Sequence, residues 1–287
     1  MSRGRDPLPR LLDHVTFAGA SLADLRQRFG RAGLTPRWGG PHDNGITHMD
    51  LVPFPDGSYL ELISTIEPGA PSPIWDAAIR HEAGPCAWAV ESDDLAAEAE
   101  ALVEAGIDVV GPAPMRRERP DGVALAWSLA FVEGMGVTLP FRIQDETPRE
   151  LRVEAPVDGP FAGVAAVVLA TRALSDLADR FHLAHAWGPP TDLGTVDELG
   201  ARIARIGDGP VLLATSHGTE SWLEERLERH GEGPCAFLLA PGDPAALAEL
   251  SLSAPEAWPG GPVRWLDLGT PHERTIGVWL RESDSTG

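Results

Sequence analysis

Four side chains in the first part of the sequence are of types that bind metal ions or transfer protons. They are His14, His42, His48 and Glu61, and Glu61 lies within an apolar run. Strand alternation puts Glu61 on the same face as Tyr59. A buried carboxylate without a partner costs several kcal/mol, so Glu61 needs a metal ion, an arginine or a hydrogen-bond donor. His14 taken alone could instead be a half-buried histidine bonded to a neighbour.

Motifs for several other chemistries are missing from the sequence. It has two cysteines, Cys86 and Cys235, and neither lies in a CxxC or zinc-finger spacing. There is no G-x-S-x-G elbow, Walker loop or dinucleotide fingerprint between a strand and a helix. These absences argue against a disulfide scaffold, a zinc finger, a serine hydrolase, a P-loop enzyme and a Rossmann enzyme.

The charge of the chain limits its partners and location. The formal net charge is −20 and every strong base is an arginine, which excludes nucleic acid and anionic membranes as expected partners. Acidity without lysine indicates a halophilic protein, whereas a GC-rich genome would explain only the missing lysines. No stretch resembles a membrane span or a secretory signal, so we expect a cytoplasmic protein.

One local basic cluster interrupts this acidic chain. It consists of Arg116, Arg117 and Arg119. The cluster could form an anion-binding edge for an acidic substrate. We favour a solvated loop whose arginines pair with surface carboxylates.

The sequence contains an internal repeat. Residues 22–29 match residues 174–181, and residues 56–65 match residues 208–217, both at a spacing of 152 residues. Residues 81–87 then match residues 230–236 after a three-residue deletion. Ordered matches of this kind predict a duplication, with halves at residues 10–150 and 160–287 joined by an acidic, proline-containing linker.

Each half divides again by the order of its expected elements. The first half begins with a strand at 12–18, a helix at 22–32 and strands at 35–39, 47–53 and 59–64. The pattern restarts with a strand at 86–90, a helix at 93–105 and strands at 109–114, 124–131 and 138–144. The second half repeats this order, with helices near 174–183 and 244–252. The chain is therefore predicted to be α+β, with four βαβββ modules.

Several of these segments resemble a known family. They are Leu12-Asp-His-Val-Thr-Phe17, Gly45-Ile-Thr-His48, Asp56-Gly-Ser-Tyr-Leu-Glu-Leu-Ile63 and Leu139-Pro-Phe141. They look like the glyoxalase-like branch of the vicinal-oxygen-chelate superfamily, and the similarity is best over roughly residues 11–150. The resemblance implies two glyoxalase-like domains with cupped mixed sheets, each around a hollow for a divalent metal and a small substrate.

The resemblance also implies roles for particular residues. In such families, metal ligands come from the first and last strands of a unit, which are the positions of His14 and Glu61. His48 would be a third ligand or a catalytic base, and His42 would contact substrate from a loop. Trp88 and Phe141 are expected to line the substrate pocket. Imidazole and carboxylate ligands suit Zn, Mn, Fe or Ni, and the metal would chelate two substrate oxygens.

The other modules depart from this pattern. In the second module, Cys86 and Phe141 stand where the two ligands would be. In the second half, Ala166 and Leu213 take their places. We therefore expect the active centre in the first half, and a degenerate second half that completes an interface, covers the cavity or supports stability.

Three functions remain open from sequence alone. The first is a metal-dependent enzyme acting on a small, oxygen-rich substrate, either a glyoxalase-like lyase or isomerase or an extradiol-type dioxygenase. The second is a metal-free protein that binds or sequesters a small molecule. The third is an oligomeric scaffold without chemistry, and a homodimer is compatible with each function.

Overall fold

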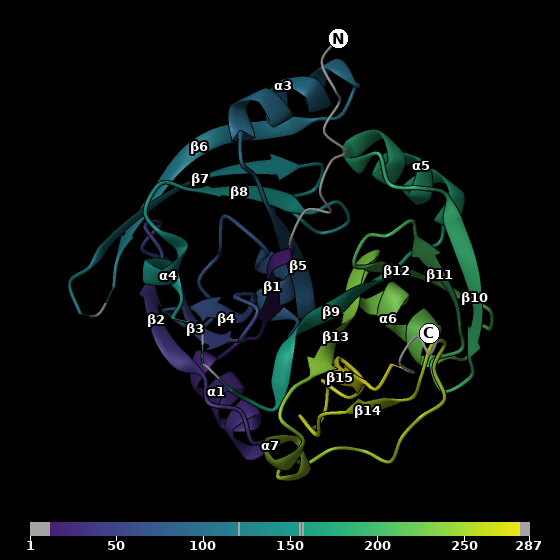
Figure 1. Cartoon of the computed structure of the whole chain (residues 1–287). Coiled ribbons are helices and arrows are strands. Elements are labelled where there is room, and N and C mark those ends of the chain that lie inside the picture. Colours follow the sequence, from purple (N-terminus) through teal and green to yellow (C-terminus); the bar gives the residue numbers. More distant parts are fainter. Residues whose placement is uncertain (1–11, 120, 155, 157, 282–287) are drawn as a thin grey trace, which may run out of the picture.

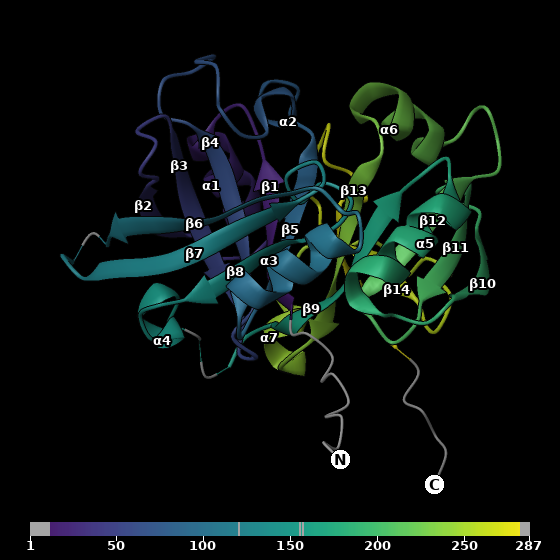
Figure 2. The ribbon, with the colours of Figure 1, turned by 90° about the horizontal axis from the view of Figure 1, so that it is seen from above.

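Two curled sheets lie side by side in the computed structural model, which describes residues 12–119, 121–154, 156 and 158–281 (Figures 1 and 2). The first sheet has eight strands in the order β2-β3-β4-β1-β5-β8-β7-β6. They are β1 (Leu12–Ala18), β2 (Arg37–Pro41), β3 (Thr47–Pro53), β4 (Tyr59–Thr65), β5 (Gly84–Glu91), β6 (Val109–Glu118), β7 (Ala124–Val132) and β8 (Phe141–Asp145). Strand β1 pairs in parallel with β4 and antiparallel with β5, so two βαβββ units share one continuous sheet.

The two long helices of this half begin at side-chain caps. Helix α1 (Leu22–Arg31) starts where the Ser21 hydroxyl accepts the Asp24 amide, and its apolar stripe buries Leu25 and Phe29. Helix α3 (Leu95–Glu104) starts at the Asp94 carboxylate, which accepts the Ala97 amide. Both begin and end within two residues of their predicted bounds.

The second sheet has seven strands in the order β10-β11-β12-β9-β13-β15-β14. They are β9 (Phe161–Ala170), β10 (Pro190–Val196), β11 (Ala201–Ile206), β12 (Val211–Ser216), β13 (Gly233–Pro241), β14 (Val263–Trp265) and β15 (Ile276–Trp279). Its helices are α5 (Leu174–His185), α6 (Trp222–His230) and α7 (Pro244–Ala248). Each sheet therefore forms within one half of the chain.

The predicted fold class is confirmed, with one difference in the last module. Among the described residues, that module has two strands after its helix, β14 and β15, instead of three. The short helices α2 (Asp76–Arg80) and α4 (Arg149–Arg152) and the helix α6 were not predicted. No helix in the described ranges is long and apolar enough to cross a membrane.

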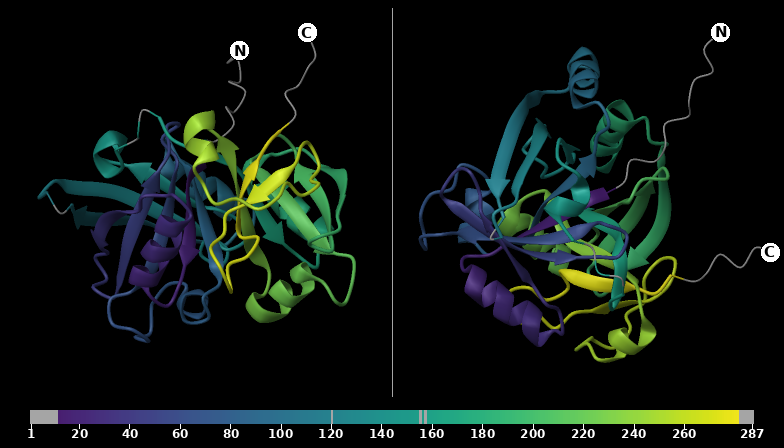
Figure 3. Two further views of the ribbon diagram at one scale, coloured as in Figure 1. Left: turned by 90° about the horizontal axis from the view of Figure 1, so that it is seen from below. Right: turned by 60° about the vertical axis from the view of Figure 1, so that its left-hand side comes forward.

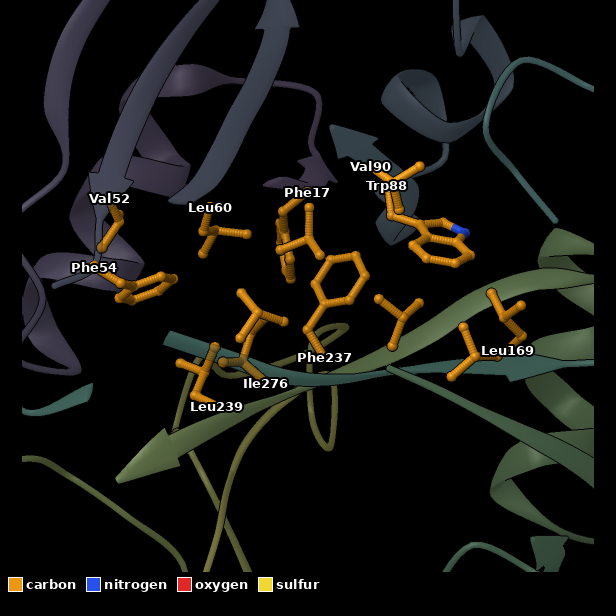
Figure 4. Close-up of a cluster of buried hydrophobic side chains, with 14 of the residues drawn as sticks. Phe17, Val52, Phe54, Leu60, Trp88, Val90, Leu169, Phe237, Leu239 and Ile276 are labelled. Atoms are coloured by element: carbon orange, nitrogen blue, oxygen red, sulfur yellow. The ribbon is translucent and has the colours of Figure 1, made fainter. Parts of the chain in front are cut away.

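A shared hydrophobic core joins the two sheets. Figure 4 shows Phe17 and Leu60 of the first sheet facing Phe237 and Ile276 of the second, and Figure 3 shows the same side-by-side arrangement from other directions. All four side chains are fully buried. The two halves are therefore held together by apolar packing, which leaves the other face of the first sheet available for a cavity.

Candidate active-site cavity

The first sheet curls around a cavity of about 230 Å³, which we call the first-sheet cavity. Strands β1, β3, β4, β6, β7 and β8 all contribute to its wall. Its apolar lining includes Trp75, Trp127, Leu129, Phe131, Phe141 and Ile143. Its polar lining is His14, His42, Asn44, Tyr59, Glu61, Arg117 and Arg152. The volume is below the roughly 300–1,000 Å³ of pockets for drug-sized ligands, so it suits a small molecule.

Strands β1 and β4 bring His14 and Glu61 together. In the parallel register His14 lies opposite Tyr59, and Thr16 lies opposite Glu61. The His14 ring stacks on the Tyr59 ring with 4.6 Å between centroids. The Nε2 atom of His14 lies 3.7 Å from Oε2 of Glu61, which is too long for a hydrogen bond.

A buried carboxylate fixes the orientation of His14. Oδ1 of the fully buried Asp13 lies 2.5 Å from Nδ1 of His14, and both Asp13 oxygens accept bonds from Arg152. Burial raises the pKa of Asp13, but Arg152 and His14 lower it more, so the pKa lies well below its usual value. Because ionised Asp13 can only accept, Nδ1 of His14 donates to it, and Nε2 of the ring is turned towards Glu61.

His42 approaches Glu61 from the loop between β2 and β3. Its Nδ1 lies 2.8 Å from the Thr47 hydroxyl, and its Nε2 lies 3.6 Å from Oε1 of Glu61. Asn44 holds the loop in place, because its side-chain oxygen accepts the backbone amides of Ile46 and Thr47. Burial lowers the pKa of His42, and Glu61 offsets this only in part. The imidazole is therefore neutral near pH 7.

Glu61 is the least satisfied member of this group. Its side chain is 8% exposed, and its Oε1 is buried without a hydrogen-bond partner among the described residues. Two imidazole nitrogens flank the carboxylate, but each faces a different oxygen. Buried polar atoms are nearly always hydrogen-bonded, so an open carboxylate oxygen in a cavity indicates a missing partner.

The donor types of this group fit a divalent metal, although their present spacing does not coordinate one. Two imidazoles and a carboxylate are ligands that Zn, Mn, Fe and Ni accept. The Asp13 bond to the far nitrogen of His14 is also usual for a metal-binding histidine. Within the described ranges, however, no three His, Cys, Asp or Glu side chains are arranged to hold an ion. Metal binding would require the three side chains to re-orient.

Two residues that were expected at the site lie elsewhere. Met49 and Leu51 of β3 line the cavity, so alternation turns His48 to the other face, where its ring meets Trp38 edge-on at 5.6 Å. Trp88 is fully buried in the core between the sheets, and its Nε1 donates to the Thr138 carbonyl. Neither side chain lines the first-sheet cavity, whereas His42 and Phe141 do.

Two arginines at the cavity were not predicted there. Arg117 belongs to β6 and is 6% exposed, which corrects the interpretation of its cluster as a solvated loop. Arg152 belongs to α4 and contacts Asp13, Asp145 and the Tyr59 hydroxyl. No local sequence signal located Arg117, because its place in β6 follows from the pairing of β6 with β7.

Within the described part of the second sheet, the positions of His14 and Glu61 carry apolar side chains. Ala166 is the counterpart of His14, and the strand register makes Leu212, rather than Leu213, the counterpart of Glu61. Both belong to an apolar cluster that contains three tryptophans, Trp258, Trp265 and Trp279. Ala166 and Leu212 also line a separate cavity of about 380 Å³, whose wall includes Arg205, Asp208 and Trp279.

Comparison with known families gives one match. A family model described as a glyoxalase-like domain matches residues 12–185. No curated protein matches the sequence.

Solved structures share the fold at low sequence identity. A mutant of 4-hydroxymandelate synthase from Streptomyces coelicolor is similar with a TM-score of 0.64 and 12% identity, over 94% of this chain and 91% of that one. A hypothetical protein from Staphylococcus aureus is similar with a TM-score of 0.58 and 14% identity, over 88% of this chain and 97% of that one. The Mn(II)-bound glyoxalase from Novosphingobium aromaticivorans is similar with a TM-score of 0.54 and 12% identity, over 94% of this chain and 82% of that one.

Proposed function

This chain belongs to the glyoxalase-like domain family of the vicinal-oxygen-chelate fold, and from that membership we propose that it is an enzyme acting on a small, mainly apolar molecule in the first-sheet cavity. In this proposal His14, Glu61 and His42 surround the reacting end of the substrate. The aromatic wall holds the remainder and excludes water. The reaction class that fits best is a proton shift of the lyase or isomerase type.

The observation that carries this proposal is the open Oε1 of Glu61 between two imidazole nitrogens. A carboxylate oxygen without a donor can accept a proton from a bound substrate. Neutral His42, 3.6 Å away, can then take up or return that proton after a small side-chain movement. Asp13 and Thr47 hold the far nitrogens of His14 and His42, so both rings present Nε2 to Glu61.

A divalent metal would be held by His14, Glu61 and His42 in this proposal. When bound, it would polarise the substrate oxygens and stabilise developing negative charge. The same donor set of two histidines and one carboxylate is used by non-haem iron oxygenases, so a dioxygenase reaction is an alternative within the enzyme class. Oxygen consumption in the presence of Fe(II) separates the two reaction types.

Metal content is the test of this proposal. The protein is purified without a metal-affinity tag and compared with His14→Ala, Glu61→Gln and His42→Ala, with His48→Ala as the matched control on the opposite face. We expect close to one metal per chain in the parent and the control, and loss of metal in the three cavity variants. A parent that neither contains nor takes up Zn, Mn, Fe or Ni would contradict the metal-dependent form.

The second candidate function is metal-free binding or sequestration of a small molecule. Apolar residues at the ligand positions of the second module favour it, because Phe141 stands in the cavity where a second carboxylate would be expected. A ligand recovered unchanged after incubation, from a protein without metal, would support this alternative.

A further inference from the structure

Arg117 lines the first-sheet cavity and also a neighbouring cavity of about 250 Å³, and its guanidinium makes no ion pair with a described residue. Its Nη1 donates to the Gly39 carbonyl at 2.5 Å, and its Nη2 donates to the Arg152 carbonyl at 3.2 Å. Both acceptors are neutral. No described carboxylate lies within ion-pair distance of its guanidinium, although the side chain is only 6% exposed.

This arrangement differs from that of the neighbouring Arg152. Arg152 forms ion pairs with Asp13 and Asp145, and through Asp13 it helps to hold His14 in place. Arg117 donates only to carbonyl groups, and the countercharge that acts on it is Glu61, which lies beyond ion-pair distance. Arg117 is therefore the cationic side chain of the cavity lining that is available to a ligand.

We propose that Arg117 recognises a carboxylate and that the substrate is a small monocarboxylic acid with an aromatic body. The guanidinium fork matches the two oxygens of a carboxylate. Trp75, Trp127 and Phe131 line the cavity and provide aromatic surface for such a group. This inference rests on the proposed function in one respect only, namely that the first-sheet cavity is the substrate site.

The charge of Glu61 sets the orientation of such a ligand. Two carboxylates repel each other, so the ligand carboxylate lies at Arg117 and its opposite end points towards Glu61. The open Oε1 of Glu61 is then free to accept a hydrogen bond or a proton from that end. Arg117 is thus a binding and specificity residue, whereas the proton chemistry stays with Glu61 and His42.

The test compares a carboxylate with an uncharged molecule of nearly the same shape. Benzoate and benzamide are titrated into the full chain by calorimetry, using the parent, Arg117→Met and Arg117→Lys. Arg116→Met is the matched control, because Arg116 is the exposed neighbour of Arg117 on the same strand and does not line the cavity. Thermal unfolding of every variant reports whether it is folded.

We expect the parent and Arg116→Met to bind benzoate at least about tenfold more tightly than benzamide. Arg117→Met loses this preference, and Arg117→Lys keeps part of it. Equal affinity for both molecules in the parent, or an unchanged preference in folded Arg117→Met, overturns the inference. If neither Arg117 variant folds, the parent alone decides, since a preference for benzoate supports the inference and its absence overturns it.

One further variant separates this inference from the proposed enzyme function. Glu61→Gln removes a negative charge from the cavity, so benzoate binding is retained or strengthened while any turnover is lost. Benzoate binding without metal uptake or turnover would leave the inference standing and contradict the enzyme. Turnover of neutral molecules alone would support the enzyme and contradict the inference.

Discussion

At the scale of single residues, Asp13 holds His14 of the candidate site by the ring nitrogen that faces away from Glu61. Its buried carboxylate contacts the imidazole of His14 and the guanidinium groups of Arg149 and Arg152. The contacts with Arg152 and His14 hold the pKa of Asp13 well below its usual value in spite of burial. Asp13 therefore links the orientation of His14 to the position of α4.

We expect Asp13→Asn to be strongly destabilising, because it leaves Arg152 buried with a weakened countercharge. The loss should be about 3–5 kcal/mol, the range found when one partner of a buried ion pair is removed. Urea denaturation monitored by circular dichroism measures it. Asp192→Asn removes an exposed ion pair with Arg202 and should leave the midpoint nearly unchanged. A midpoint for Asp13→Asn equal to that of the control would refute the central role of Asp13.

At the scale of elements, alternation and capping predicted most of the helices and strands but only part of the site. The helices at 22–32 and 93–105 carry apolar stripes, and Tyr59 and Glu61 share the cavity face as expected. The face of His48 was not predictable, because the cavity lining is itself apolar. Met49 and Leu51 therefore have the same pattern as residues that face a core.

Two other site features were hidden for different reasons. Arg117 lies in a run of charged residues that is typical of a loop, and only the pairing of β6 with β7 shows that the run is a strand. Trp88 lies between alanines in its strand. Only the packing of the two sheets against each other shows which face of that strand belongs to the shared core. Contacts between distant segments cannot be obtained from the local periodicity of one sequence.

Helix α6 provides a test of local capping. The Ser221 hydroxyl accepts the Glu224 amide at 3.1 Å, and two acidic residues occupy the first turn. Ser221→Ala should cost about 1 kcal/mol of unfolding free energy, whereas Ser221→Asp should retain most of it, since aspartate is also a good N-cap. Chemical denaturation compares the three proteins. Equal losses in both variants would mean that capping does not explain the role of Ser221.

At the scale of the whole molecule, the contact between the halves includes buried ionisable groups. His272 follows β14 and its ring meets the Phe17 ring of the first half edge-on, 5.0 Å between centroids. The pKa of His272 is lowered from 6.5 to about 4, mainly by burial and then by the nearby Arg28 and Arg226. Glu273 acts in the opposite direction, and His230 acts with the arginines. Native His272 is therefore neutral at pH values at which the unfolded chain is protonated.

The stability of the protein should fall as the pH drops through this interval. Because the unfolded histidine binds a proton below about pH 6.5 and the native one does so only below about 4, the unfolded state gains stability between these values. The contribution of His272 is up to about 3 kcal/mol. His272→Phe should reduce the change in unfolding free energy between pH 7 and pH 5. An identical change in parent and variant would assign the acid sensitivity to other groups.

The buried tryptophans of the second sheet make this chain a scaffold for protein engineering. Replacing a buried tryptophan with a small residue leaves a hole that the surrounding structure closes only in part. Trimming Trp265 would therefore open an artificial chamber in one half while the other half keeps its own cavity. A single polypeptide would then offer two separate compartments, one shaped by evolution and the other specified by design.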